Sequence, residues 1–386
     1  MFHQHGKAAW ITDPFSLNHP LAAADGHHVP DIHDFLKFVV ENNASDLHIK
    51  AGSPPSVRAS GNLGRTEFPR MSGADTEEAA MTMMTEDHIV TLKQKGEVDF
   101  AYSEPGTGRF RVNVHRQRGS IAIAARLVLA SVPSFPSLGL PPAVEQLAGE
   151  HRGLLLVTGP TSSGKTTTTG SIISHINATR PAHILTIEDP IEILHNDQMS
   201  VVTQREIGMD TGDFATALRA AMRQDPDVIF VGEIRDTETV RAALQAAETG
   251  HFVVATMHTT DVSETVNRVI DFFPPHQQNQ ARVALASTIC GVISQRLLPR
   301  KGGGRVAAIE IMVMNGRIRD LILNADKTHM MHEILAESGF YGMQTFDQAL
   351  LGLYRDGLVT LDDAKNAATS AHDFQIALRA EGLQEI

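Results

Sequence analysis

The octapeptide Gly-Pro-Thr-Ser-Ser-Gly-Lys-Thr at 159–166 constrains the fold of this chain more than any other feature. It matches the pattern GxxxxGK[ST], it follows the apolar run 154–158, and a helix is predicted to begin at Gly164. Glycines allow backbone N–H groups to converge on phosphate oxygens, and the start of a helix adds a partial positive charge. We therefore predict a phosphate-binding loop between a strand and a helix rather than a glycine-rich turn without a ligand.

This loop predicts ATP and Mg²⁺ as the cofactors. Lys165 is expected to reach the β and γ phosphates, and the hydroxyl of Thr166 is expected to bind the metal ion. The predicted nucleotide-binding residues are Gly159, Pro160, Thr161, Ser162, Ser163, Gly164, Lys165, Thr166 and Thr167.

Beyond the loop, predicted strands and helices alternate. The strands are apolar along their whole length, which is typical of a parallel sheet covered by helices on both faces. From about Met331 onward, amphipathic helices dominate. The fold class is therefore α/β, with a nucleotide-binding core and C-terminal helices. After the loop, strands are predicted at 184–187, 228–231 and 252–256, and helices near 214–222 and 237–248.

The sequence before the core predicts a smaller α+β domain. Apolar residues from Phe35 to Val40 recur at helical spacing, and strands are predicted at 45–49, 109–115 and 121–129. Two prolines and three serines at 131–137 indicate a linker. The predicted organisation is a disordered tail at 1–30, an N-terminal domain at 31–130, the linker at 131–137 and the ATPase domain with its helical end at 138–386.

The tail and the composition bear on other functions and on location. The histidines at 1–30 are irregularly spaced and lack cysteine partners, which favours a solvated tail over a metal site. With 33 Lys and Arg against 45 Asp and Glu, direct nucleic-acid binding is not expected. Cys290 is the only cysteine, which suits a reducing compartment. No secretion signal or membrane-spanning run is recognised, so we expect a soluble cytoplasmic protein.

Two acidic segments follow predicted core strands. Glu233 ends the strand at 228–231 and would lie at the sheet edge where open α/β sheets bind ligands, holding Mg²⁺ directly or through water. Glu188, Asp189 and Glu192 follow the strand at 184–187, and one of them could deprotonate the attacking water. The alternative for this second segment is that Asp189-Pro190 only initiates a turn.

Two histidines frame the strand at 252–256. His251 precedes it and His258 follows it. Beside a nucleotide, such side chains could contact the γ-phosphate by hydrogen bonding. The alternative is that they are structural residues at the two strand ends.

These motifs together resemble the secretion ATPase superfamily, in particular its type IV pilus retraction branch of PilT and PilU type. The resemblance covers about 31–386 and is carried by the loop at 159–166, the acidic box at 187–192, the strand ending at Glu233 and the box ending at His258. Supporting strings are Ser45-Asp46-Leu47-His48, Gly52 to Pro55 with Arg58 and Gly61, Gln204-Arg205-Glu206, Asp225-Pro226-Asp227 and Gly342-Met343-Gln344-Thr345.

The resemblance implies a RecA-like core, a PAS-like N-terminal domain and a hexameric ring. It also implies that Glu192 activates water, that Glu233 serves Mg²⁺ and that His258 contacts the γ-phosphate region. Arg111 and Arg126 match the family's arginines that reach bound nucleotide, where a planar cation stabilises charge on the transferring phosphoryl group. From the residues alone, both would be interpreted as solvated arginines on strands.

Two departures bear on the branch. Assembly and type II secretion motors usually carry a four-cysteine zinc element, which Cys290 alone cannot build. The alanine-isoleucine-arginine-asparagine-leucine-isoleucine-arginine-glutamate motif of PilT-type motors is matched at 317–324 only in its core, and 342–350 looks closer to the PilU type.

We therefore expect a hexameric Mg²⁺-dependent ATPase that powers pilus retraction. Its expected partners are an inner-membrane platform protein, which would dock it at the inner face of the cell membrane, and a paralogous pilus ATPase. The alternatives are an accessory PilU-type ATPase or a related secretion or conjugation motor. A module that binds nucleotide without hydrolysing it is a further alternative, which Glu192, Glu233, Arg111 and Arg126 disfavour.

Overall fold

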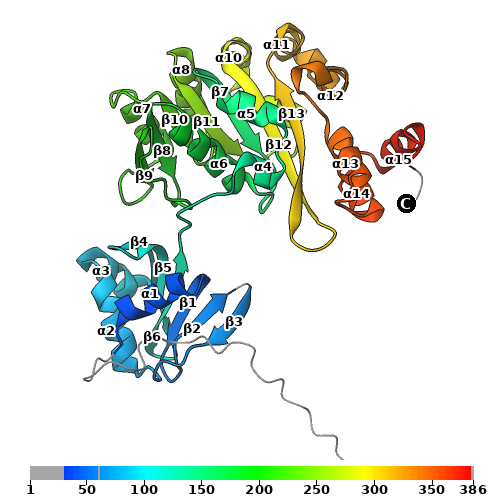
Figure 1. The fold of residues 1–386 in the computed structure, drawn as a ribbon. Coiled ribbons are helices and arrows are strands. Elements are labelled where there is room, and N and C mark those ends of the chain that lie inside the picture. The colour runs from blue at the N-terminus through cyan, green and yellow to red at the C-terminus, as the bar shows by residue number, and fades with distance from the viewer. Residues whose placement is uncertain (1–29, 60, 384–386) are drawn as a thin grey trace, which may run out of the picture. The chain divides into compact units, whose positions relative to one another are not determined.

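The computed structural model of the chain describes residues 30–59 and 61–383. They form two compact units, which divide between Ala130 and Ser131 (Figure 1). Unit 1 denotes the part before this division and unit 2 the part after it. Apart from Pro30, the predicted tail and its histidines lie outside the described residues.

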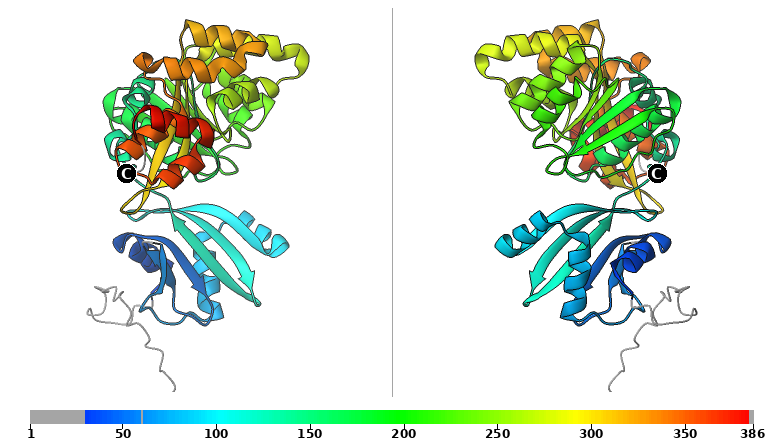
Figure 2. Two further views of the ribbon diagram at one scale, coloured as in Figure 1. Left: turned by 90° about the vertical axis from the view of Figure 1, so that its right-hand side faces the viewer. Right: turned by 90° about the vertical axis from the view of Figure 1, so that its left-hand side faces the viewer.

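Unit 1 is an antiparallel sheet with helices on one face (Figure 2). The helices bury their apolar residues against alternate strand residues such as Leu47, Phe110 and Val112, which leaves the opposite face polar. This is the predicted α+β domain of PAS-like type. The strand order is β3-β2-β1-β6-β5-β4. The elements are α1 (Ile32–Glu41), β1 (Ala44–Lys50), β2 (Ser56–Ala59), β3 (Asn62–Arg65), α2 (Gly73–Met83), α3 (Glu86–Lys95), β4 (Glu97–Glu104), β5 (Gly108–Gln117) and β6 (Ser120–Leu127).

Unit 2 is built on a seven-stranded sheet in the order β13-β12-β7-β11-β10-β8-β9. Every neighbouring pair is parallel except β12 and β13, which are antiparallel. This is the predicted RecA-like core. The strands are β7 (Gly153–Thr158), β8 (His183–Glu188), β9 (Val201–Glu206), β10 (Val228–Val231), β11 (Phe252–Met257), β12 (Ile289–Pro299) and β13 (Arg305–Val313).

Alternate residues of each core strand belong to different apolar layers, which explains why these strands are apolar throughout. On β7, Leu154 and Leu156 pack with the helices of one face, whereas Leu155 and Val157 pack with those of the other. The first layer contains α7 (Phe214–Ala221), α8 (Thr237–Glu248), α9 (Val262–Asp271) and α10 (Pro275–Thr288), and the second contains α5 (Pro142–Ala148) and α6 (Lys165–Thr179).

The C-terminal helices predicted from the sequence are present. Leu298 on β12 and Ala308 on β13 join them in a further apolar cluster. Within the described parts of the chain, no helix combines the length and apolar character needed to cross a membrane. The elements are α11 (Gly316–Leu323), η1 (Ala325–Met330), α12 (Met331–Glu337), η2 (Gly339–Tyr341), α13 (Phe346–Arg355), α14 (Leu361–Ala367) and α15 (Ala371–Ala380).

The linker predicted at 131–137 is wrong for its second half, which forms helix α4 (Phe135–Leu138). The side chain of Phe135 is buried in the same apolar layer as α5 and α6, and the hydroxyl of Ser171 donates a 2.8 Å hydrogen bond to the Pro133 carbonyl. Pro136 is tolerated because it occupies the first turn, where its missing N–H has no helical partner to lose. Composition indicated a linker here, but burial of the Phe135 ring packs its second half against the core.

A buried carboxylate joins β13 to α9. Glu310 is 4% exposed, and its Oε2 accepts a 2.8 Å hydrogen bond from the backbone N–H of Val262 in the first turn of α9. Burial raises the pKa of Glu310 to about 7, although this hydrogen bond opposes the rise.

Because the folded pKa exceeds the unfolded one, Glu310 contributes stability that is complete below about pH 4.5 and is lost as the pH rises through about 7. We predict that Glu310→Gln, which still offers an oxygen to Val262, becomes more stable relative to the wild type between about pH 5 and about pH 8. Guanidinium unfolding midpoints at both pH values measure this change. The exposed Glu333→Gln on α12 is the control, and an equal difference at both pH values for Glu310→Gln would contradict the prediction.

Candidate active site at the phosphate-binding loop

The phosphate-binding loop lies directly on β12, at a distance that only glycine permits. Gly159 has φ +148°, and a Cβ there would lie 2.5 Å from the carbonyl oxygen of Gln295. Gly164 has φ +91°, and its Cβ would lie 2.9 Å from the Gln295 side-chain nitrogen. That nitrogen donates a 2.6 Å hydrogen bond to the carbonyl of Ser163. Sequence reasoning missed Gln295 because it follows Ser163 by 132 positions and belongs to no local motif.

The start of α6 offers backbone donors to an anion. Gly164 is the N-cap residue, no side chain caps the helix, and its first turn contains no acidic residue. The N–H groups of that turn have no helical partner and lie at the positive end of the helix dipole. Thr166 is exposed in this first turn. The local structure therefore matches the predicted phosphate site.

The ammonium of Lys165 folds back over the loop. Its Nζ donates hydrogen bonds of 2.7 Å to the Gly159 carbonyl and 2.9 Å to the Pro160 carbonyl. Burial lowers the pKa of Lys165, and the charges of Glu233 and Glu192 oppose this effect. The lysine thus lies within the electrostatic field of both predicted carboxylates.

A cleft of about 420 Å³ beside the loop brings together Lys165, Thr166, Glu192, Glu233 and His258. These residues are distant in the sequence, but they all lie at or beyond the carboxyl ends of parallel strands. The strand register aligns those ends, because Thr158 pairs with Met257 and Val231 pairs with Ile187. The parallel sheet therefore assembles one site from separate motifs.

Glu233 has a partner on each of its two carboxylate oxygens. Arg235 donates a 2.6 Å hydrogen bond to its Oε2, and His258 Nε2 lies 3.1 Å from its Oε1. Burial alone would raise the pKa of Glu233, but the hydrogen bond from Arg235 and the nearby His258 outweigh it and hold this pKa below its ordinary value. Glu233 is therefore a carboxylate at neutral pH. Sequence reasoning missed Arg235, although a cation two residues after Glu233 was a visible signal.

The acidic box divides into one buried and two accessible carboxyl groups. Glu188 is 8% exposed and accepts hydrogen bonds from the Thr186 hydroxyl at 2.6 Å and the Gln204 amide at 3.1 Å. Burial raises its pKa to about 7. Glu192 and Asp189 are exposed, and both line the cleft. Glu188 thus serves as a buried acceptor, which leaves the other two able to meet a water molecule.

The two histidines around β11 lie at opposite edges of the sheet. His258 follows Met257, which pairs with the last residue of β7, whereas His251 precedes Phe252, which pairs with the first. His251 Nδ1 instead lies 3.0 Å from the Ala246 carbonyl. The hypothesis that both histidines flank the nucleotide is wrong for His251, because one strand cannot present both ends to the same edge.

Buried hydroxyls connect the phosphate-binding strand to the segment that follows His258. The Thr265 hydroxyl on α9 lies 2.6 Å from that of Thr259 and donates to that of Thr158 at 3.4 Å. Thr158 is in turn 2.8 Å from the hydroxyl of Ser294 on β12. All four residues are buried. Strands β7 and β12 and helix α9 are thereby held together directly beneath the loop.

A second cavity, of about 670 Å³, is lined by the phosphate-binding loop, by α4 and by the β12–β13 hairpin. Its lining includes Gly164 and Thr167 from the loop region, Leu297 from β12, and Arg300 and Arg305 from the hairpin. The phosphate-binding loop therefore borders a hollow with acidic residues and another with basic and apolar residues.

Arg111 and Arg126 belong to unit 1, where they lie opposite each other on β5 and β6. Arg126 is held by Asp46 of β1, because its Nε lies 2.7 Å from Oδ1 while its side chain remains 73% exposed. Burial alone would raise the pKa of Asp46, but hydrogen bonds from Ser45 and Arg126 hold it below its ordinary value. Two neighbouring guanidinium groups on one polar face favour an anionic ligand.

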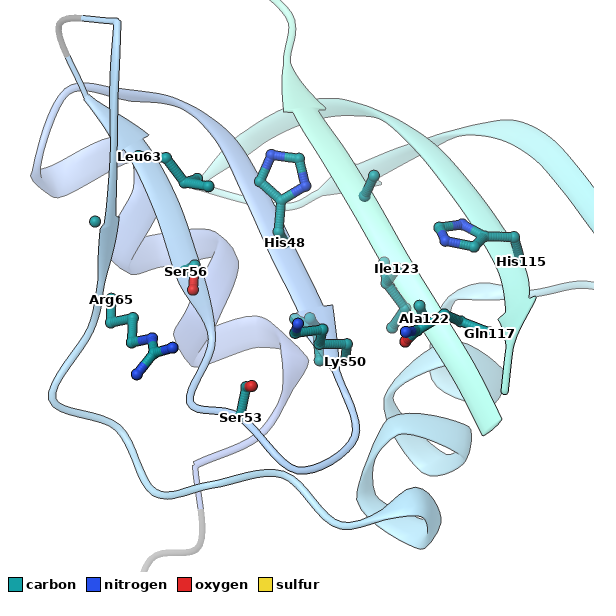
Figure 3. A pocket seen from close by; sticks show the side chains of 13 residues that line it. His48, Lys50, Ser53, Ser56, Leu63, Arg65, His115, Gln117, Ala122 and Ile123 are labelled. Carbon is teal, nitrogen blue, oxygen red and sulfur yellow. The ribbon is translucent and has the colours of Figure 1, made fainter. Parts of the chain in front are cut away.

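The polar face of unit 1 also has a hollow of about 440 Å³, drawn in Figure 3. His48 and Lys50 extend from β1 and His115 from β5, with the small side chain of Ala122 between them. Among the described residues that line it, Lys50 and Arg65 are cationic and none is acidic. The positive character of this face thus extends beyond the two arginines.

The close contact between the loop and Gln295 generates a prediction. Gly159→Ala should displace the loop and weaken binding of a fluorescent ADP analogue by at least about tenfold, because its Cβ would overlap the Gln295 carbonyl. Gly250→Ala is a matched control, since Gly250 also has a positive φ, +104°, but has nothing within 4 Å of its Cβ. Equal affinities of the two variants in fluorescence titrations would contradict the proposed seating of the loop.

Comparison with known proteins identifies relatives that extend over both units. The sequence profile of the family described as Type II/IV secretion system protein matches residues 22–353. The type IV pilus retraction ATPase PilT of Pseudomonas aeruginosa is 41% identical over 344 residues, which cover 89% of this chain and 100% of that relative. The type IV pilus ATPase PilU of the same organism is 37% identical over 345 residues, covering 89% and 90%.

A solved structure agrees with these sequence matches. The crystal structure of the pilus retraction motor PilT with bound ADP superposes with a TM-score of 0.82 at 48% identity, covering 89% of this chain and 98% of that one. The similarity includes the N-terminal unit, the nucleotide-binding core and the C-terminal helices. The chain belongs to the type II/IV secretion system protein family and is an ATP-hydrolysing enzyme of its pilus and secretion ATPases.

Proposed function

We propose that this ATPase is a hexameric, Mg²⁺-dependent motor that powers retraction of type IV pili. The observation that carries the proposal is the convergence of Lys165, Glu192, Glu233 and His258 on one cleft beside the phosphate-binding loop. The 41% identity to PilT over 89% of the chain supports the same function.

In this proposal the phosphates of ATP lie along the loop at 159–164 and the start of α6. The γ-phosphate faces the cleft, where Lys165 exchanges its two carbonyl partners for phosphate oxygens. The base and ribose occupy the second cavity, between Leu297 and the hairpin arginines Arg300 and Arg305. This orientation places the scissile bond on the side of the loop that carries the carboxylates.

The hydroxyl of Thr166 and the carboxylate of Glu233 would hold Mg²⁺, together with phosphate oxygens and water. These donors fit the ion, because Mg²⁺ prefers oxygen ligands and Glu233 stays charged at neutral pH. When bound, the ion neutralises charge on the phosphates. Arg235 and His258 hold Glu233 in place from both of its oxygens, which fixes the direction in which its carboxylate can act.

Glu192 is proposed as the base that accepts a proton from the attacking water. Its carboxyl group is accessible and lines the cleft, and its charge acts on Lys165. Glu188 is a poorer candidate, because it is buried and already accepts hydrogen bonds from Thr186 and Gln204. His258, bound to Glu233, would contact the oxygens of the γ-phosphate.

Arg111 and Arg126 are proposed to reach nucleotide bound to a RecA-like unit of the ring. Asp46 orients Arg126 and leaves most of its side chain exposed, as such a contact requires. Movement of unit 1 against unit 2 during hydrolysis would then drive pilus disassembly through an inner-membrane platform protein. The motor would work in the cytoplasm, docked to the membrane through its partners.

An accessory ATPase of PilU type is the second candidate. It is favoured by the loss of the charged end of the PilT-type motif at 317–324 and by the sequence at 342–350. The PilU of P. aeruginosa is 37% identical to this chain. Expression in a host that lacks its own retraction ATPases discriminates the two, because only a motor of PilT type restores twitching by itself.

Glu192→Gln should lower steady-state Mg-ATP turnover by at least about 100-fold while affinity for an ATP analogue stays within about threefold, because only proton transfer is lost. Lys165→Ala should lose both turnover and affinity for the ATP analogue. The exposed Glu248→Gln on α8 is the control and should retain turnover. Full turnover by Glu192→Gln would reject it as the base, and absence of turnover in the wild type at every concentration would favour a module that only binds nucleotide.

Arg126→Ala should lower turnover by at least about 100-fold if its guanidinium stabilises the transferring phosphoryl group. Arg116→Ala removes another exposed arginine, on β5, and should leave turnover unchanged. In the wild type, turnover per subunit should fall on dilution, because ring dissociation would separate shared sites. Activity of Arg126→Ala equal to that of Arg116→Ala would count against the role of unit 1 in catalysis.

A further inference from the structure

The main chain that follows Glu192 is held by the side chain of Gln204 on β9. The amide nitrogen of Gln204 donates a 2.8 Å hydrogen bond to the carbonyl of Ile193, and its oxygen accepts a 2.9 Å hydrogen bond from the backbone N–H of His195. The same nitrogen also donates to Glu188 Oε1 at 3.1 Å. One amide therefore fixes the main chain immediately after Glu192 and joins it to the buried end of β8.

The main chain on the other side of Glu192 is held in the same way. The backbone N–H of Ile191 donates a 3.2 Å hydrogen bond to Glu206 Oε2, again from β9. The backbone N–H of Glu192 itself is hydrogen-bonded to Glu188. Ile191 and Ile193 are both buried, at 5% exposure each. Glu192 thus extends from a short segment whose neighbours on both sides are anchored.

We propose that Gln204 is a positioning residue for hydrolysis, which fixes where the Glu192 carboxylate meets the attacking water. This inference rests on the proposed role of Glu192 as the base. Gln204 does not line the cleft, so it acts through the segment at 191–195 and not on the nucleotide. Displacement of a reacting group by about 1 Å can cost on the order of 100-fold in rate, which is why such an anchor matters.

The chemistry of the amide explains why glutamine suits this position. It supplies donors to Ile193 and Glu188 and an acceptor to His195 from one planar group. A carboxylate would lose both donated bonds, and an apolar side chain would lose all three. Gln204 is paired with Thr186 in the parallel register of β8 and β9, and the Thr186 hydroxyl shares the Glu188 oxygen with it.

The test uses Gln204→Met in the full-length protein, which keeps the side-chain length but removes every hydrogen bond. Turnover should fall by about 10-fold to 100-fold, while affinity for an ATP analogue and KM stay within about threefold. Gln198→Met, an identical change at an exposed position between this segment and β9, is the matched control and should retain turnover. Wild-type turnover by Gln204→Met would overturn the proposal, as would an equal loss in the control.

A double-mutant cycle with Glu192→Gln separates positioning from general destabilisation. If Gln204 acts through Glu192, then adding Gln204→Met to Glu192→Gln should change turnover by less than about twofold. A second loss of the full size would overturn the role of Gln204 and leave Glu192 as the base. Full activity of Glu192→Gln alone would instead overturn the proposed base, and the inference with it.

Melting temperatures of all variants accompany the kinetics. If Gln204→Met does not fold, Gln204→Asn takes its place, because it keeps the amide but withdraws it by one methylene. The expected result is the same loss of turnover with retained nucleotide affinity. Adding Gln204→Asn to Glu192→Gln should again leave turnover nearly unchanged. A Gln204→Asn variant that folds and turns over like the wild type would overturn the proposal.

Discussion

The approach of the phosphate-binding loop to Gln295 is the constraint on which the rest of the site depends. At Gly159 and Gly164 the backbone comes so close to β12 that a Cβ would overlap Gln295. The Gln295 amide then holds the loop by donating a hydrogen bond to the carbonyl of Ser163. Because Gln295 holds the loop against the sheet, α6 begins at a defined place and its free N–H groups face a defined direction. Thr158 and its buried hydroxyl partners extend this anchorage to α9.

Similar carboxyl groups acquire different chemistry around this fixed loop. Glu233 is kept charged by Arg235 and His258, whereas burial raises the pKa of Glu188 to about 7. Glu192 remains accessible in the cleft, while the hydrogen bond that Gln204 donates to Ile193 and the one that Glu206 accepts from Ile191 fix the main chain on both sides of it. One strand end thus supplies a metal-binding candidate, another a buried acceptor and a candidate base. The differences arise from burial and partners, since the three side chains are chemically the same.

In unit 1, a carboxylate similarly determines how a cationic side chain is held. Arg111 and Arg126 are neighbours on adjacent strands, where like charges repel unless an anion or a carboxylate lies between them. Asp46 supplies one such carboxylate to Arg126 and leaves the guanidinium exposed.

The sequence by itself determined the elements and the chemistry of the loop, because those depend on local pattern. Apolar runs, helical spacing and the glycines of 159–166 predicted the parallel core, the α+β domain and the phosphate site, and the fold class was correct.

Tertiary structure decided which side chains meet. The residue pattern alone could not distinguish Glu188 from Glu192, which only the family resemblance singled out. It also left open whether His251 lies beside the nucleotide, because burial and the direction of a strand depend on the whole sheet. Gln295, Asp46 and Gln204 contribute through contacts with residues distant in the sequence or on another strand. Asp46 and Gln204 lie in strings that carry the family resemblance, but no local pattern indicates which residues they contact. Phe135 ordered the predicted linker for the same reason: its environment is supplied by the core and not by its neighbours in the chain.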